Sequence, residues 1–229
     1  MGFIVIEGLD GSGKSTQIRL IETYLKQKNI KTQFIHFPRT DADIWGDLIS
    51  RFLRGDLGDI NTVNPYLIAL IYAGDRNDVA PRLLDWMKEG SMVIADRYLY
   101  SNIAFQCAKL NDMEQKIRLA RWIKKLEYDY NQIPVPDLNL FLNVPFQFTR
   151  QSLENHREGN DRDYLKGEID IHEADLNFQE RVREVYLWQV KENSDFDQVD
   201  CRGPEGKMLD PKSISEKIIE KIRFKLSLP

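Results

Sequence analysis

The chain has 229 residues, of which 42% are hydrophobic and 30% charged, with a net charge of −4 at pH 7. This balance is typical of a soluble globular protein and gives no overall attraction to nucleic acid or to an anionic membrane. Two distant cysteines, Cys107 and Cys201, fit neither a zinc site nor a disulfide framework, and no apolar run approaches membrane-spanning length. We therefore expect a cytoplasmic enzyme or nucleotide switch without a nucleic-acid or membrane partner.

The first motif follows a short apolar strand over residues 3–6. Residues 8–15 (GLDGSGKS) fit the phosphate-loop pattern G-x-x-x-x-G-K-[ST], and a helical pattern follows them. Glycines let backbone N–H groups wrap phosphate oxygens, and the start of a helix adds its positive dipole end. An ordinary glycine-rich turn is the alternative, but the strand and helix on either side favour a nucleoside triphosphate site. The predicted nucleotide-binding residues are Gly8, Asp10, Gly11, Ser12, Gly13, Lys14, Ser15 and Thr16.

Two of these residues have more specific roles. Lys14 can reach the β- and γ-phosphates, and the Ser15 hydroxyl can coordinate Mg²⁺.

The rest of the chain alternates between strand and helix patterns. The predicted elements are a strand at 32–37, a helix at 42–54, a loop at 55–64, a helix from Pro65 to about Gly90 with candidate breaks at Gly74 and Pro81, a strand at 91–95, helices at 99–110 and 112–130, a strand at 138–144, a helix at 173–192, a strand at 197–200 and a helix at 211–226. Such alternation predicts an α/β fold of the P-loop NTPase kind, with a five-stranded parallel sheet flanked by helices.

The length would also permit two domains, but the chain shows no repeat and no convincing linker. We expect a single P-loop domain over 1–229, with a mobile lid insert at about 150–172, the most polar stretch. The charged side chains of the 112–130 helix are interpreted as a solvated face rather than a partner site.

Polar residues follow two more strands at their carboxyl ends, where ligands gather in an open α/β sheet. Arg39 follows the second strand, and Asp96 and Arg97 follow the third. Two arginines suit a second phosphate group, because a guanidinium can bind it through two parallel hydrogen bonds. Asp96 fits a carboxylate linked to Mg²⁺, with capping of the next helix as the alternative. Structural roles for the two arginines are the competing interpretation.

Four further segments form a recognisable set of landmarks. Residues 96–106 (DRYLYSNIAFQ) fit the signature D-R-[YH]-x-x-S-x-x-A-[YF], and residues 37–39 form an F-P-R segment. Residues 72–76 fit the pattern aromatic-x-x-x-Arg, and residues 136–142 fit a P-D-x-x-x-x-L strand. In these motifs and in their order, over essentially the whole chain, the sequence resembles the thymidylate kinase family, whose members phosphorylate dTMP with ATP.

The resemblance implies a role for each substrate-binding residue. Arg39 and Arg97 would bind the dTMP phosphate, and Phe37 and Pro38, which precede Arg39, would belong to the same substrate site. Asp10 would approach the sugar 3′-hydroxyl. Tyr72, a phenylalanine in many relatives, would stack on thymine, and Arg76 would bond to a base carbonyl. Ser101, Asn102 and Gln106 would line the base edge, Phe105 would exclude a 2′-hydroxyl, and Tyr164 would also contact dTMP. A core aromatic at Tyr72 and a surface arginine at Arg76 are the alternatives.

The same resemblance assigns catalysis to Lys14, Asp96 and Arg97 and to an arginine of the lid. Because Gly11 stands where some relatives have a loop arginine, the lid must supply that charge, as in the bacterial-like type. Arg157 and Arg162 are the candidates, with Arg150 behind them at the strand exit; a solvated charged loop is the alternative. The implied cofactors are ATP and Mg²⁺, and a homodimer is implied as well.

Two rivals to a dTMP kinase stay open. The same fold could act on another nucleotide, such as dUMP, or on a deoxynucleoside, although an acceptor without phosphate would not require Arg39 and Arg97. A nucleotide-dependent switch or adaptor is the other rival, and the N-K-x-D segment typical of guanine-reading switches is missing from the sequence.

Overall fold

The structure is a computed structural model that describes residues 2–60, 62–154, 164–168 and 170–227. Within them, five strands form one sheet in the order β2-β3-β1-β4-β5, and every pair is parallel. The strands are β1 Phe3–Glu7, β2 Thr32–His36, β3 Met92–Asp96, β4 Leu138–Asn143 and β5 Phe196–Asp200. This confirms the predicted fold class, and the carboxyl ends of β1, β2 and β3 lie side by side.

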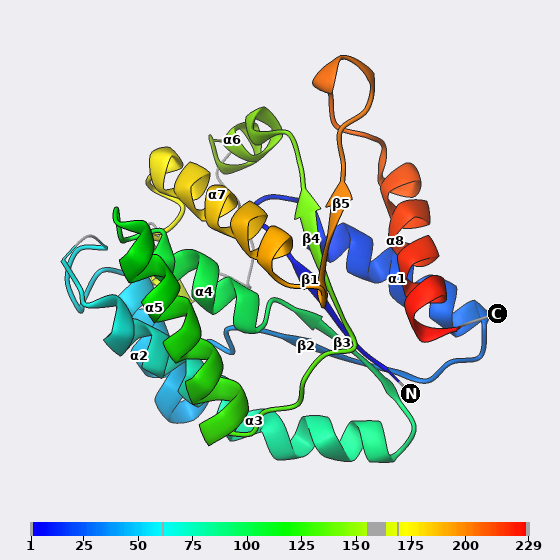
Figure 1. Cartoon of the computed structure of the whole chain (residues 1–229), viewed down its shortest axis with the longest axis horizontal. Helices are drawn as coiled ribbons and strands as arrows, with labels where there is room; N and C mark the ends of the chain where they lie inside the picture. The colour runs from blue at the N-terminus through cyan, green and yellow to red at the C-terminus, as the bar shows by residue number, and fades with distance from the viewer. Residues whose placement is uncertain (1, 61, 155–163, 169, 228–229) are drawn as a thin grey trace.

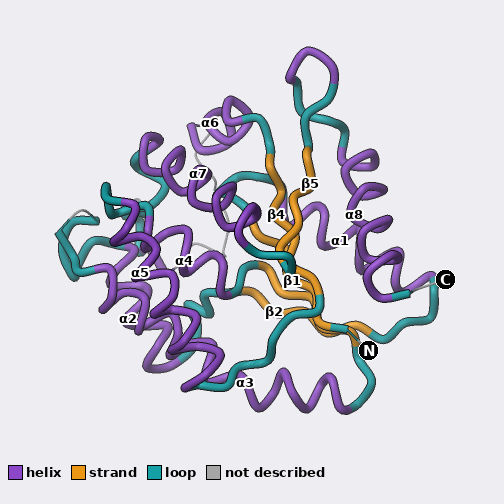
Figure 2. Tube along the Cα trace, viewed as in Figure 1, coloured by secondary structure: helices purple, strands orange, loops and turns teal. Residues whose placement is uncertain are grey.

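Helices cover both faces of the sheet (Figure 1). They are α1 Lys14–Gln27, α2 Asp43–Leu53, α3 Pro65–Lys88, α4 Leu99–Cys107, α5 Met113–Lys124, α6 Phe146–Glu154, α7 Leu176–Glu192 and α8 Pro211–Leu226, with a π-helical turn at Lys125–Tyr130 and a 3₁₀ turn at Pro204–Gly206. In Figure 2, α1 and α8 lie on one side of the strands, and α4, α5 and α7 lie on the other.

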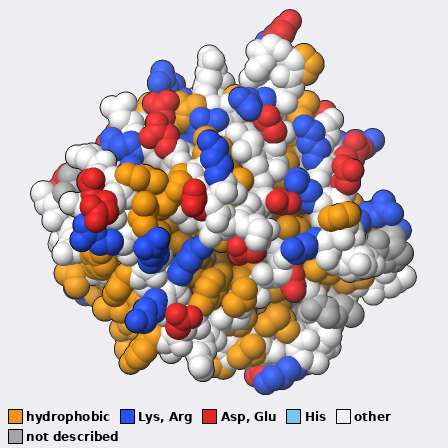
Figure 3. Space-filling view, in the orientation of Figure 1, with side chains coloured by type: hydrophobic (Ala, Val, Ile, Leu, Met, Phe, Trp, Pro, Cys, Tyr) orange, Lys and Arg blue, Asp and Glu red, His pale blue; other side chains and the backbone are white. Residues whose placement is uncertain are grey.

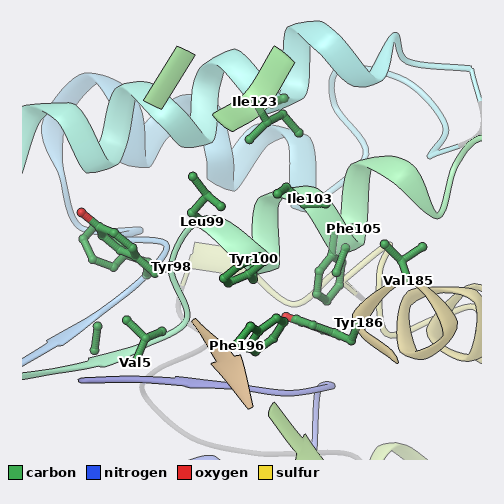
Figure 4. Close-up of a cluster of buried hydrophobic side chains, with 14 of the residues drawn as sticks. Val5, Tyr98, Leu99, Tyr100, Ile103, Phe105, Ile123, Val185, Tyr186 and Phe196 are labelled. Carbon is green, nitrogen blue, oxygen red and sulfur yellow. The ribbon is translucent and has the colours of Figure 1, made fainter. Parts of the chain in front are cut away.

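Alternation along the buried strands divides the core between the two faces of the sheet. In β1, Ile4 and Ile6 face the cluster formed with α1 and α8, whereas Phe3 and Val5 face the larger cluster under α3, α4, α5 and α7. Figure 4 shows how that larger cluster surrounds α4. The ring of Tyr100 stacks on Phe196, with centroids 4.0 Å apart. Helix α4 is therefore held rigidly beside the ends of β1 and β3.

Helix α3 has neither of the breaks considered at Gly74 and Pro81. At Gly74 the indole of Trp45 lies so close that a Cβ atom would overlap it, so the glycine permits α2 to pack against α3. Pro81 removes one backbone hydrogen bond, but Ala80 and Leu83 beside it are buried in the core. Packing of the apolar face outweighs the local preference here.

The predicted lid begins within a helix that the sequence pattern did not indicate. This helix, α6, contains Arg150, which therefore does not lie at the exit of β4 as predicted. The apolar pair Phe146 and Phe148 marks this helix. Residues 155–163 lie outside the described part of the chain, and with them the two predicted lid arginines, Arg157 and Arg162.

Candidate active site

The phosphate loop joins β1 to α1 and presents the start of that helix to a cavity of about 1190 Å³. Gly13 is the N-cap of α1 with φ 83°, a left-handed conformation that glycine adopts at little cost, and no side chain of the described residues caps the helix. Its first backbone N–H groups therefore have the arrangement that binds a phosphate. Lys14 lies beside them, with Nζ 3.0 Å from the carbonyl oxygen of Leu9 and 3.9 Å from Asp96 Oδ1.

The same cavity brings together nearly all the predicted site residues that the structure describes. These lining residues are Asp10, Gly11, Ser12, Gly13, Lys14, Ser15, Thr16, Phe37, Pro38, Arg39, Tyr72, Arg76, Asp96, Arg97, Ser101, Asn102, Phe105, Gln106 and Tyr164. Gly8 and Arg150 do not line it. A Cβ at Gly8 would lie 2.7 Å from Ser12 Oγ, so this glycine serves the packing of the loop. The phosphate loop and the predicted substrate-binding residues thus line the same cavity.

Arg97 connects these two sets. Its backbone has φ 68°, which is uncommon for a residue with a side chain, and its Nη2 donates to Asp10 Oδ1 at 2.7 Å. Burial would lower the pKa of Arg97, but the Asp10 carboxylate together with Tyr186, Asp96 and Glu7 outweighs burial and raises it. The pKa of Asp10 is lowered in turn, because Arg97 and Lys14 outweigh the effect of burial. The pair places a fixed guanidinium next to the phosphate loop.

Below Arg97 lies Glu7, a fully buried carboxylate to which no role was assigned from the sequence. Its Oε1 accepts from the backbone N–H groups of Tyr98 and Ser101 at 3.0 and 3.2 Å, and its Oε2 accepts from the Tyr186 hydroxyl at 3.0 Å. Glu7, and not Asp96, therefore caps α4, which excludes the capping interpretation of Asp96.

Ser101 was predicted to line the base edge, and it does line the cavity. Its hydroxyl, however, already bonds to Glu7 Oε2 and to Arg97 Nη1. These contacts favour a role in orienting Arg97.

Asp96 has the properties that a carboxylate near Mg²⁺ requires. It is 4% exposed, and its Oδ1 accepts no hydrogen bond from the described residues. Burial alone would raise the pKa of Asp96, but Lys14 and His36 outweigh it and keep the carboxylate ionised. Ser15 lies on the same cavity wall. A hydroxyl, a carboxylate and phosphate oxygens are hard oxygen donors that suit Mg²⁺, and the described residues contain no cluster of three acidic, His or Cys groups that could hold a metal alone.

Arg39 and Arg76 are both paired with carboxylates. Arg39 donates through Nε to Asp75 Oδ1 at 2.8 Å and through Nη2 to Asp78 Oδ2 at 2.6 Å. Arg76 is 2% exposed, which excludes the surface interpretation, and its Nη2 donates to Glu127 Oε1 at 2.7 Å. Both guanidiniums are thus held in place on the cavity wall.

A further group of residues missed in the sequence closes the cavity from the side of α7. The ring of His172 stacks on Phe178 and contacts Phe105, and its backbone N–H donates to Asp170 Oδ1 at 2.8 Å. Tyr164 donates to Asp170 Oδ2 at 3.1 Å. For His172 and Asp170, the sequence signal is a lone histidine beside acidic residues in an otherwise polar segment, whereas Tyr164 was predicted. Burial lowers the pKa of His172 well below its ordinary value, so its ring is neutral.

Asp170 makes the stability of this wall depend on pH. Burial, with the nearby charges of Asp10 and Glu173, raises its pKa from 3.8 to about 7. Since the unfolded chain ionises near pH 4 and the folded protein near pH 7, folding becomes less favourable as the pH rises between them, and the full cost is present above pH 7. We expect Asp170→Asn to gain thermal stability relative to the wild type between pH 5 and 8.5, by on the order of 5 °C in Tm. If the difference in Tm between Asp170→Asn and the wild type stayed the same across that pH range, the assignment would be wrong.

Comparison with known proteins agrees with this geometry. Residues 6–207 match the family model described as thymidylate kinase. A probable thymidylate kinase of Thermococcus onnurineus is 36% identical over 190 residues, which cover 81% of this chain and 82% of that protein. A probable thymidylate kinase of Pyrococcus horikoshii is 32% identical over 187 residues, which cover 81% of this chain and 80% of that protein.

The fold is shared with a solved structure as well. The thymidylate kinase of Candida albicans superposes with a TM-score of 0.71 and 23% identity, covering 97% of this chain and 91% of that one. The cavity joins a phosphate loop to a second arginine-lined site, and the sequence match extends through both. The chain belongs to the thymidylate kinase family, the kinases that transfer a phosphoryl group from ATP to dTMP.

Proposed function

We propose that this chain transfers the γ-phosphoryl group of Mg²⁺-ATP to the phosphate of dTMP in the cavity described above, giving dTDP and ADP for nucleotide biosynthesis. The contact between Arg97 and Asp10 supports this most, because it puts an acceptor-binding guanidinium 2.7 Å from a residue of the phosphate loop. Donor and acceptor phosphates bound on either side of that pair would be neighbours. Positioning of this kind supplies much of the catalysis in phosphoryl transfer.

On the donor side, the open N-terminus of α1 and Lys14 would hold the β- and γ-phosphates. Ser15 and Asp96 would hold the Mg²⁺ site, and the ion, when bound, neutralises charge on the phosphate oxygens. The buried Asp96 Oδ1, to which no described residue donates a hydrogen bond, supports this assignment. Nothing in the reaction needs a general base, since the dTMP phosphate is already an anionic nucleophile.

On the acceptor side, Arg97 would bind the dTMP phosphate, and Arg39 would join it by sharing its guanidinium with Asp75 and Asp78. Tyr72 would stack on thymine, and Phe105, whose ring lies 5.0 Å from the Arg97 guanidinium, would cover the sugar. The Tyr72 ring also packs edge-on against Phe52, with centroids 6.5 Å apart, which supports its placement in the pocket wall.

We assign the remaining catalytic charge to the lid, to Arg157 or Arg162, and propose a lid at about 150–172. The packing of the phosphate loop supports this indirectly. Gly11 has φ 71°, and a Cβ there would lie 2.6 Å from Ser152 Oγ on α6. A long side chain at Gly11 would displace that helix, so positive charge has to come from elsewhere.

We further propose one kinase domain over 1–229, a homodimer and a cytoplasmic location. A dimer face made of helices is supported by exposed apolar side chains, Leu67 and Leu70 on α3 and Ile44 on α2. Figure 3 shows hydrophobic side chains gathered on part of one surface among charges of both signs. Light scattering would give the mass in solution.

The cytoplasmic location is supported by the cysteines. Both cysteines are unbridged, as in a reducing compartment. Among the described residues, none of the helices has the length and apolar character to cross a membrane.

The reaction is tested by coupled ADP release with ATP and a panel of dTMP, dUMP, dCMP, UMP and thymidine, with and without Mg²⁺. We expect selective turnover of dTMP that disappears when EDTA removes the metal and returns when Mg²⁺ is added. Preferred turnover of another acceptor would overturn the base pocket but keep the donor site. ADP release that no acceptor stimulates would favour a nucleotide-dependent switch.

A further inference from the structure

Helix α5 continues into a π-helical turn, Lys125–Tyr130, that carries a fully buried carboxylate, Glu127. Glu127 follows Leu119 and Ile123 at intervals of four residues, so it continues the buried face of α5. A carboxylate at such a position is costly unless charged or polar partners surround it. Single π-turns in helices often occur at functional sites.

Glu127 has its partners on two other helices. Its Oε2 accepts from Arg76 Nε at 2.5 Å, and its Oε1 accepts from Arg76 Nη2 at 2.7 Å. The same Oε1 also accepts from Asn102 Nδ2 at 2.9 Å. Arg76 comes from α3 and Asn102 from α4, and both line the cavity. Burial would lower the pKa of Arg76, but the Glu127 carboxylate raises it, so the guanidinium stays charged.

These contacts fix the orientation of the Asn102 amide. Its Nδ2 donates to Glu127 Oε1 and to the backbone carbonyl of Ala69 at 3.0 Å, and neither oxygen can act as a donor. The amide therefore cannot be turned over, and its Oδ1 stays buried without a partner among the described residues. Asn102 presents a hydrogen-bond acceptor to the ligand.

Arg76 presents the opposite polarity. Glu127 uses Nε and one N–H of Nη2, and the other guanidinium N–H groups remain to donate. Thymine and uracil offer a donor at N3–H and an acceptor at O4, which complement this pair. Cytosine offers an acceptor at N3 and a donor amino group at C4, so both contacts would be mismatched.

We propose that Glu127 is a positioning residue that sets the polarity of the base pocket and so discriminates against a cytosine nucleotide. It acts through Arg76 and Asn102 and does not touch the substrate. The inference rests on the proposed function, since it takes dTMP as the ligand whose base meets these two side chains.

The test is Glu127→Gln, assayed with dTMP, dUMP and dCMP. The glutamine carries one acceptor atom and an NH₂ group that faces the donors of Arg76 and Asn102, so the Asn102 amide is free to turn its Nδ2 towards the base. We expect the kcat/KM ratio of dTMP to dCMP to fall roughly tenfold or more, mainly through KM for the deoxynucleotides. The KM for ATP should stay within about twofold of the wild type.

Two comparisons separate positioning from a general loss of structure. Asp195→Asn makes the same carboxylate-to-amide change at a residue outside the cavity that accepts from the Tyr100 hydroxyl at 2.9 Å, and should leave the ratio unchanged. In an Asn102→Ala background, Glu127→Gln should alter the ratio much less, because the amide through which it acts is gone. Glu127→Asp keeps the charge and should give an intermediate ratio, which covers the case in which Glu127→Gln does not fold.

The outcomes are distinguishable. The positioning role would be overturned if the kcat/KM ratio of dTMP to dCMP were unchanged in folded Glu127→Gln and Glu127→Asp. Equal losses of kcat/KM for all acceptors and for ATP would overturn it as well. In either case, turnover of dTMP by the wild type would still uphold the proposed function. A wild-type protein that does not turn over dTMP would instead refute the proposed function, on which this inference depends.

Discussion

Replacing Arg97 with alanine is expected to lower kcat/KM for dTMP by roughly 10³-fold, with a much smaller change in the KM for ATP. The guanidinium is 7% exposed and held by Asp10, Ser101 and the Tyr186 hydroxyl, so its position is fixed by its neighbours. Arg97→Lys should recover only part of the loss, because an ammonium cannot make two parallel hydrogen bonds to a phosphate. Steady-state kinetics with each substrate varied in turn measures both effects.

The Arg97–Asp10 contact adds a second consequence. Without Arg97, the Asp10 carboxylate would lose the nearby positive charge that affects it most, would be compensated less by Lys14 alone, and would repel ATP. Arg97→Ala in an Asp10→Asn background removes that repulsion and so isolates the loss of acceptor binding. Arg118→Ala, which removes an exposed guanidinium paired with Glu114 on α5, is the matched control and should behave as the wild type. Equal losses of dTMP and ATP binding in the double variant would contradict the assignment of Arg97 to the acceptor.

Elements with local signals could be predicted from the sequence. The last helix was predicted at 211–226 and is α8, Pro211–Leu226, because Asp210 caps it and Pro211 fits its first turn. Helix α3 was harder, since Pro81 is a local signal for a break that tertiary packing overrides. Helix α6 was missed because its apolar face is short and the stretch after it is polar.

The site divides in the same way. Residues adjacent to a strand end or inside a compact motif, such as Lys14, Asp96 and Arg97, were predictable because the chain itself brings them to one edge of the sheet. His172 lines the cavity, and Glu127 bonds to two residues that line it, Arg76 and Asn102. Both positions result from packing of segments distant in the chain, which no local spacing reports. A carboxylate on the apolar face of a helix is a pattern that could have revealed Glu127, because a buried charge requires partners.

Glu7 was visible in the sequence only as the residue that ends β1, yet its removal is expected to have the largest effect on stability. Glu7→Ala would leave two backbone N–H groups, of Tyr98 and Ser101, and the Tyr186 hydroxyl without their acceptor inside the core. Loss of one member of a buried charged network typically costs about 3–5 kcal/mol, here a fall in Tm of about 10 °C. Thermal melting followed by circular dichroism measures it.

Activity should fall further than stability in Glu7→Ala. Arg97 sits at φ 68° directly before the α4 segment that Glu7 caps, so loss of the cap lets this backbone relax and the guanidinium move away from Asp10. Glu7→Gln is the matched control: its carbonyl oxygen still accepts from both backbone N–H groups, and its amide can donate to the Ser101 and Tyr186 hydroxyls, so most of the stability should remain. If Glu7→Ala melted like the wild type, or lost stability but kept its kcat/KM for dTMP at temperatures where it is folded, Glu7 would not be what holds Arg97 in place.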